Sequence, residues 1–161
     1  MTREERERAY TEAAQRRSHA MYRLALSVLR NPYDAEDAVS EAFENAWAHL
    51  DRIRDLDAMP AFLMRCALNS ARDRKRKLKK EAPAEIREEK LGAAEEGDPV
   101  WIYLTGLPEK FSVPMMLHFG DDFTVEEIAE ILRIPRGTVS SRISRGLKML
   151  RDEMEEGGGK A

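Results

Sequence analysis

The chain has 161 residues, a formal net charge of −3, 42% hydrophobic residues and 35% charged residues. This composition is typical of a soluble globular protein with one domain or two small ones. No apolar run approaches the ~18 residues that a membrane-spanning helix needs, and the first residues, MTREERERAY, carry charge where a signal peptide needs an apolar core. We therefore expect a cytoplasmic protein that does not insert into a membrane.

The cysteine and histidine content argues against catalysis and metal binding. Cys66 is the one cysteine, which excludes an intramolecular disulfide and a cysteine-based metal framework. The histidines, His19, His49 and His118, are scattered, with no carboxylate at metal-ligand or catalytic-triad spacing. We predict no catalytic residue, no metal site and no cofactor, and we do not expect an enzyme.

Charge is distributed unevenly along the chain. Residues 71–80, ARDRKRKLKK, are strongly basic, and residues 131–151 contain six Arg and Lys residues without a carboxylate. Residues 81–98 are acidic, rich in small residues and interrupted by Pro83 and two glycines. A polyanion responds to local fields rather than to net charge, so the two basic segments are candidates for nucleic-acid binding. The acidic segment is interpreted as a flexible linker.

Three amphipathic helices are predicted before the linker. The first ends at Asn31-Pro32, the second has Asp34 as its expected N-cap, and the third has Pro60 in its first turn. The apolar stripes at helical spacing consist of Met21, Leu24, Ala25, Val28 and Leu29, then Val39, Ala42, Phe43, Ala46, Trp47 and Leu50, then Met59, Phe62, Leu63, Cys66, Ala67 and Ser70. These stripes can bury one another, which predicts a helical domain over residues 10–80.

The second half of the sequence predicts four short helices between residues 99 and 155, separated by Gly and Pro breakers. No alternation typical of β-strands is found in the first half. The expected fold is therefore all-α, with two small helical domains, 10–80 and 99–155, joined by the flexible linker 81–98.

The last two predicted helices form a helix-turn-helix pattern. Thr124 and Glu127 have the spacing of a capping box ahead of an apolar run, and a turn at residues 133–135 precedes a second apolar stripe. If Val139, Ile143 and Leu147 point inward, polar side chains on the other faces can reach phosphates and base edges in a major groove. These side chains are Arg136, Thr138, Ser141, Arg142 and Arg145. A cationic helix with an ordinary solvated face is the alternative, although such faces usually mix both charges.

Two polar surfaces are also predicted in the first domain. Side chains that project together from the third helix suit contacts to phosphates or to single-stranded or distorted DNA, although basic residues at a helix end also complement its dipole. These are Asn69, Arg72, Asp73 and Lys75. The second helix carries Glu36, Asp37, Glu41 and Glu44, an acidic surface that points toward a protein partner.

The order of these motifs resembles the extracytoplasmic-function (ECF) sigma factors, the small two-domain members of the sigma-70 family of bacterial RNA polymerase. DAEDAV and AFENAW look like the core of region 2, and AFLMRCALNSARDRKRK is similar to the segment that reads the −10 element. The stretch from LPEKF to KMLR resembles region 4. The resemblance covers nearly the whole chain apart from the first few residues, the linker and the tail.

The resemblance implies a transcription-initiation factor that binds core RNA polymerase, through its β and β′ subunits, and promoter DNA. It implies docking on the β′ clamp for Asp37, Glu41, Phe43 and Trp47. It implies −10 recognition for Asn69, Arg72, Asp73 and Lys75, capture of a flipped base for the loop 51–57, and −35 recognition for Arg136, Thr138, Ser141, Arg142 and Arg145. An anti-sigma protein that wedges between the domains is a further implied partner.

The sequence departs from the family pattern at Ser40, Phe62, Leu68 and Gly146, where Gln, Trp, Arg and Ala are usual. Glycine inside a helix costs ~1 kcal/mol relative to alanine, and Gly146 is expected to permit close helix packing. Two other functions remain open from the residues alone. One is a stand-alone helix-turn-helix regulator that binds duplex DNA as a dimer. The other is an adaptor that sequesters polymerase without directing initiation.

Overall fold

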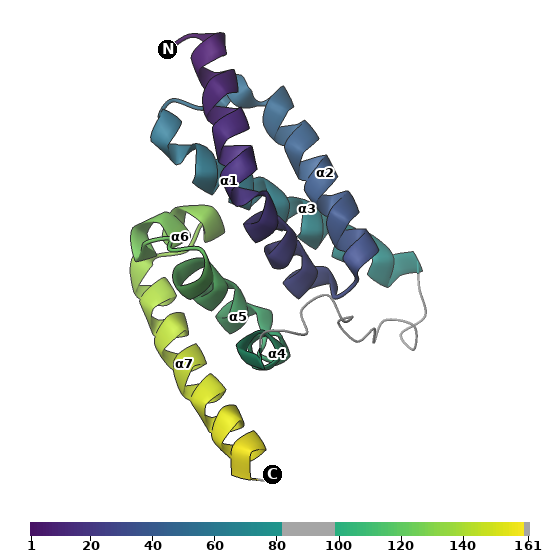
Figure 1. Cartoon of the computed structure of the whole chain (residues 1–161), viewed down its shortest axis with the longest axis vertical. Coiled ribbons are helices and arrows are strands. Elements are labelled where there is room, and N and C mark those ends of the chain that lie inside the picture. The colour runs from purple at the N-terminus through teal and green to yellow at the C-terminus, as the bar shows by residue number, and fades with distance from the viewer. Residues whose placement is uncertain (82–98, 160–161) are drawn as a thin grey trace. The chain divides into compact units, whose positions relative to one another are not determined.

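The computed structural model describes the backbone of residues 1–81 and 99–159, and the side chains of residues 1–81 and 103–156 (Figure 1). Every regular element in these residues is helical, which confirms the predicted all-α fold. The chain divides into two compact units, Met1–Leu91 and Gly92–Ala161. The predicted linker lies, apart from Glu81, outside the described residues. Within the described residues, no helix is both long enough and apolar enough to span a membrane.

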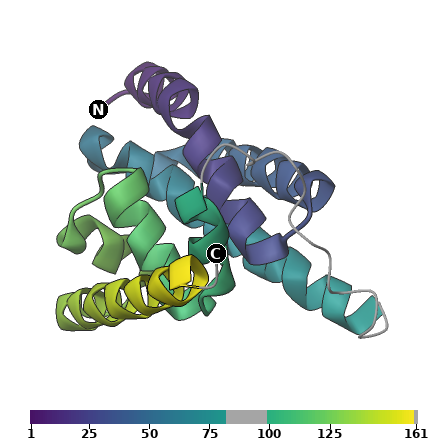
Figure 2. The same cartoon turned by 60° about the horizontal axis from the view of Figure 1, so that its bottom comes forward.

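The first unit consists of α1 (Arg3–Leu29), α2 (Pro32–Ala48) and α3 (Met59–Glu81). Two 3₁₀ turns, η1 (Leu50–Arg52) and η2 (Leu56–Ala58), connect α2 to α3. Figures 1 and 2 show the three long helices packed along one another. The core between them contains Met21, Leu24, Leu63, Met64 and Leu68, each at most 1% exposed.

The start of α1 precedes residue 10, where the sequence predicts the first domain to begin. Thr2 and Glu5 form a capping box, in which the Thr2 hydroxyl accepts from the Glu5 N–H and the Glu5 carboxylate accepts from the Thr2 N–H. This cap satisfies two N–H groups that the first turn leaves without helical partners. The first turns of α1 therefore form part of the folded unit.

The boundary between α1 and α2 is set by Asn31 and Pro32. The Asn31 side chain accepts from the Asp34 N–H at 3.0 Å, so Asn31 is the N-cap and the predicted cap at Asp34 is wrong. Pro32 occupies the first helical position, where its missing N–H would have no partner and its fixed φ suits the helix. The dipeptide that ends α1 thus also starts α2.

The inward face of α2 is lined by alanine. Ala35, Ala38, Ala42 and Ala46 are each 0% exposed, whereas Trp47, predicted in the core stripe, is 43% exposed. Small side chains let α1 and α3 approach α2 closely, which leaves the larger apolar residues of α2 on its flank. The prediction of Trp47 as a core residue was therefore wrong.

The second unit consists of α4 (Pro99–Gly106), α5 (Glu109–Met115), the π-helical segment η5 (Met116–Gly120), α6 (Val125–Leu132) and α7 (Arg136–Gly159). Its core includes Phe111, Met115, Leu117, Phe123, Ile128 and Val139. The last helix has 24 residues and is not short. Figure 2 shows it as one continuous helix.

The capping box predicted at the start of α6 is present. The Thr124 hydroxyl accepts from the Glu127 N–H at 3.1 Å, and the Glu127 carboxylate accepts from the Thr124 N–H at 3.0 Å. At the other end, Arg133 adopts the left-handed conformation with φ 57°, and its N–H donates to Ala129. Residues 133–135 then connect α6 to α7, which gives the helix, turn and helix expected from the sequence.

Candidate nucleic-acid and partner interfaces

The outer face of α7 carries four of the five predicted DNA-binding residues together. Val139 and Ile143 are 0% and 8% exposed and fix the buried side of the helix. At about 100° per residue, the four polar residues fall within an arc of about 100° that runs from the outer side of α7, where Ser141 and Arg145 are exposed, onto one flank, where Thr138 and Arg142 are half-buried. They are Thr138, Ser141, Arg142 and Arg145. Lys148 is exposed beside this arc and was missed, although its helical spacing from Ser141 and Arg145 could have revealed it.

Arg136, the fifth predicted residue, lies outside that arc. It is the first residue of α7, and Arg136 Nη2 is 2.9 Å from Oε1 of Glu126, the second residue of α6. Both side chains are largely exposed, at 70% and 57%. Glu127 caps α6, whereas its neighbour Glu126 reaches α7.

The charges along α7 oppose its own dipole. Its N-terminal half carries only cations, and its C-terminal half carries Asp152, Glu153, Glu155 and Glu156. A helix N-terminus favours anions and a C-terminus favours cations, each by roughly 0.3–1 kcal/mol, so this arrangement lowers the stability of the free helix. An anionic ligand beside the first turn of α7 would offset the N-terminal part of that penalty.

The outer face of α3 forms a second polar surface. Asn69, Arg72 and Asp73 are exposed, and Arg76 lies between them on the same arc of about 100° and pairs with Asp73. Lys75, the fourth predicted residue, is half-buried and lies about 60° to one side. Arg76 was missed, although its spacing from Arg72 and Asp73 could have identified it.

Arg74 projects from α3 in the other direction, toward α2. Its Nη1 atom lies 3.7 Å from Asp34 Oδ1 and 3.8 Å from Asp37 Oδ2. The Arg74 Nε atom is buried without a hydrogen-bond partner in the described residues. Asp37, a predicted docking residue, is thus in contact with the helix that carries the predicted −10 residues.

The four predicted docking residues of α2 do not share one face. Asp37 and Glu41 lie on the edge near α3, and Phe43 and Trp47 lie on the edge near α1. The most outward positions between them are Tyr33, Ser40 and Glu44. Tyr33 is 79% exposed, more than any other large apolar or aromatic side chain of the described residues. It was missed because it precedes the predicted start of the helix.

An aromatic cluster holds the α1 edge of this surface. The Tyr10 ring packs edge-on against Phe43 and Trp47, with centroids 6.2 and 5.2 Å apart, and the Tyr10 hydroxyl donates to the Phe43 carbonyl at 3.0 Å. The Arg3 guanidinium lies 5.3 Å from the centroid of the Trp47 ring and forms ion pairs with Glu7 and Asp51. The first turns of α1 thus orient Trp47.

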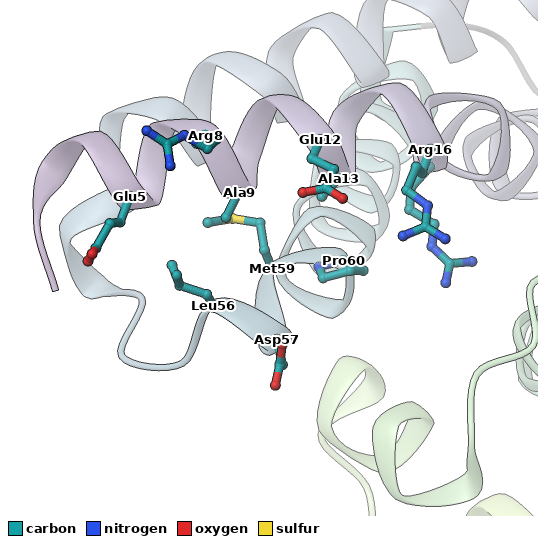
Figure 3. Close-up of a pocket in the computed structure, with 11 residues that line it drawn as sticks. Glu5, Arg8, Ala9, Glu12, Ala13, Arg16, Leu56, Asp57, Met59 and Pro60 are labelled. Atoms are coloured by element: carbon teal, nitrogen blue, oxygen red, sulfur yellow. The ribbon is translucent and has the colours of Figure 1, made fainter.

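A cavity of about 360 Å³ lies between α1 and the loop that precedes α3 (Figure 3). Leu56, Met59 and Pro60 form an apolar wall opposite Ala9 and Ala13 of α1. Its remaining lining is charged and of both signs, namely Glu5, Arg8, Glu12, Arg16, Arg17 and Asp57. The predicted base-capturing loop 51–57 thus contributes Leu56 and Asp57 to a cavity that has an apolar wall and a charged lining of both signs.

Cys66 is half-buried in α3. Burial raises the pKa of the Cys66 thiol to about 11, which keeps it protonated near neutral pH. Among the described residues, no group of three His, Cys, Asp or Glu side chains could hold a metal ion.

Two compact helical units, one of them with a helix-turn-helix, are an arrangement used for DNA binding, and comparison with known proteins identifies the family. Residues 14–81 match Sigma-70 region 2, and residues 103–152 match Sigma-70, region 4. The RNA polymerase sigma factor SigV of Bacillus subtilis is 30% identical over 139 residues, which cover 83% of each chain. The chain belongs to the sigma-70 family, in its ECF group.

Other relatives agree with this assignment. The ECF RNA polymerase sigma factor SigW of Bacillus subtilis is 29% identical over 156 residues, covering 84% of this chain and 83% of the relative. The fold is similar to the sigma factor RpoE in complex with the anti-sigma factor NepR from Bartonella quintana (TM-score 0.73, 21% identity, 91% and 96% coverage). It is also similar to CnrH in complex with the cytosolic domain of CnrY (TM-score 0.71, 24% identity, 93% and 90% coverage).

Proposed function

We propose that this chain binds core RNA polymerase and directs promoter-specific initiation by recognising −35 and −10 elements. The observation that carries the proposal is the arc of Thr138, Ser141, Arg142 and Arg145 on α7, in which Ser141 and Arg145 are exposed and Thr138 and Arg142 are half-buried. In a helix-turn-helix the second helix lies in the major groove with its N-terminal residues at the base edges, where Arg reads guanine and hydroxyls contact bases or phosphates. For α3, membership of the sigma-70 family implies the corresponding role, recognition of the −10 element.

In this proposal the outer face of α3 holds the −10 element. Asn69 and Arg72 offer an amide and a guanidinium to bases and phosphates, and Asp73 orients Arg76. The cavity beside the loop 51–57 has an apolar wall, with Met59 and Pro60, that suits the face of an unstacked base, and its charged lining balances three Arg with three carboxylate side chains. Extrusion of a base costs a few kcal/mol, which these contacts and those of polymerase offset.

The exposed face of α2 is the proposed site of polymerase docking. Asp37, Glu41, Phe43 and Trp47 flank an outward line that includes Tyr33 and Glu44. Acidic side chains beside exposed aromatic rings suit a basic partner surface with apolar contacts, such as a polymerase coiled coil. We also propose an anti-sigma partner. RpoE was solved in complex with the anti-sigma factor NepR, and CnrH was solved in complex with the cytosolic domain of CnrY.

The binding test is co-elution of the purified chain with core RNA polymerase on size exclusion. Stable co-elution that Trp47→Ala weakens is the expected result. Failure to bind core, together with a tight dimeric complex on free duplex DNA, would identify a stand-alone regulator instead. Binding to core without new transcripts in the run-off assay described in the Discussion would identify an adaptor that sequesters polymerase.

A further inference from the structure

The Glu126–Arg136 ion pair bears on what Arg136 contacts in DNA. Arg136 Nη2 is 2.9 Å from Glu126 Oε1, and the two residues come from different helices of the helix-turn-helix. Glu127 performs the capping of α6, so Glu126 is not required for that cap. An exposed ion pair of this kind adds little stability, which leaves its effect on Arg136 as its main consequence.

A carboxylate beside an arginine discriminates between two kinds of ligand. A phosphate brings a negative charge close to Glu126, and like charges at short distance repel. A guanine edge is neutral and presents two acceptors, O6 and N7. Because Arg carries five N–H donors, one Nη2 hydrogen can remain on Glu126 while other donors face the guanine. Glu126 therefore disfavours a phosphate contact by Arg136 more than a base contact.

We propose that Arg136 reads a guanine of the −35 element and that Glu126 is its positioning residue, which also suppresses binding of Arg136 to phosphate. This inference rests on the proposed function. It separates Arg136 from the other cations of α7, none of which pairs with a carboxylate among the described residues. Its consequence is that Glu126 increases sequence discrimination while it lowers affinity for non-promoter DNA.

The test measures DNA binding by holoenzyme reconstituted from core polymerase and the full chain. The DNA is a promoter fragment that run-off transcription has identified. Wild type, Glu126→Gln, Arg136→Gln and the double variant are each measured on fragments with every −35 base pair substituted, and on a non-promoter fragment, over a range of salt. Asp122→Asn is the matched control, since it removes one nearby negative charge and Asn tolerates the left-handed conformation at φ 60°.

Arg136→Gln is expected to abolish discrimination at one G·C pair. Glu126→Gln is expected to reduce discrimination at that same pair about two- to fivefold, a range set by the strength of exposed ion pairs. It should raise the affinity for non-promoter DNA. It should also increase the number of counterions released on binding, read from the salt dependence of that affinity, by about one. In the Arg136→Gln background, Glu126→Gln should leave discrimination unchanged. Thermal unfolding should be nearly unchanged in all variants.

Three results would overturn the inference. One is that Arg136→Gln lowers the affinity for all DNA sequences equally and makes that affinity less dependent on salt, which would make Arg136 a phosphate contact. Another is that Glu126→Gln raises the affinity for promoter and non-promoter DNA by the same factor, which is the result expected for Asp122→Asn. The third is an effect of Glu126→Gln on discrimination that persists without Arg136. Wild-type holoenzyme that forms no specific complex would instead refute the proposed function and this inference with it.

Discussion

Gly146 of α7 lies directly against Met115 of α5. A Cβ atom at position 146 would stand 2.3 Å from Met115 Sδ, 3.2 Å from Met115 Cγ and 3.3 Å from Phe111 Cβ. Glycine at this position therefore allows α7 to pack closely on α5, as expected from the sequence. The helix-interior cost of glycine, about 1 kcal/mol, is offset by this contact.

Gly146→Ala should destabilise the second unit. Met115 is 1% exposed, so its side chain has little room to move away from the new methyl group. Overpacking costs about 1–3 kcal/mol, and the gain in helix propensity recovers about 1 kcal/mol, so we expect a net loss of about 1 kcal/mol. Thermal unfolding measures it. Gly137→Ala is the control, because nothing lies within 4 Å of its added Cβ, and it should be neutral or stabilising.

Arg133→Gly should stabilise the turn between α6 and α7. Arg133 has φ 57°, a left-handed conformation that costs a residue with a side chain roughly 1–2 kcal/mol. Glycine adopts it without that cost but loses more chain entropy on folding, so the net gain is about 0.5–1 kcal/mol. Urea unfolding of Arg133→Gly and Arg133→Ala distinguishes the effect of the backbone conformation from the effect of losing the Arg133 side chain. Equal stability of both variants would show that the backbone conformation is not the cause.

Tyr33→Ser should weaken polymerase binding without destabilising the protein. The Tyr33 ring is 79% exposed on the outward line of α2, so its removal changes little in the core. Aromatic side chains often dominate interface energies, and a loss of about 1–2 kcal/mol in affinity for core polymerase is expected. His19→Ser, at an exposed ring on α1, is the control. Unchanged binding of Tyr33→Ser would exclude Tyr33 from the docking surface.

Folding stability should fall between about pH 9 and pH 11 because of Cys66. Burial raises the pKa of the Cys66 thiol to about 11, above its ordinary value near 9. In that window the unfolded chain has lost the thiol proton and the folded chain retains it, so stability is present below pH 9 and declines as pH rises. Cys66→Ala should remove this part of the pH dependence in urea unfolding. Tyr10→Phe is measured beside it, because burial also raises the Tyr10 pKa.

Much of the helical layout follows from local sequence rules. The Thr124–Glu127 capping box and the inward positions of Val139 and Ile143 depend on spacing within one helix, and the structure contains them as predicted. The sequence pattern was less reliable for α2, which packs against two helices at once. There the small alanines set how closely the helices approach, and the larger Trp47 is displaced toward solvent.

Contacts between helices could not be predicted from spacing. The Arg136–Glu126 pair depends on how α6 crosses α7, and the approach of Arg74 to Asp34 and Asp37 depends on how α3 passes α2. Neither crossing is encoded in the periodicity of a single helix. The early start of α1 was missed because its first turns are polar and are held by a cap and by Arg3 rather than by an apolar stripe.

Run-off transcription tests the central claim most directly. Core polymerase is incubated with genomic fragments, with and without the full chain, and fragments that yield transcripts are remade with the −35 or the −10 segment replaced. We predict discrete transcripts that require the chain, that are lost on either replacement, and that Arg142→Ala reduces. The same transcripts from core polymerase alone, or a chain that binds core and yields no transcript, would contradict the account.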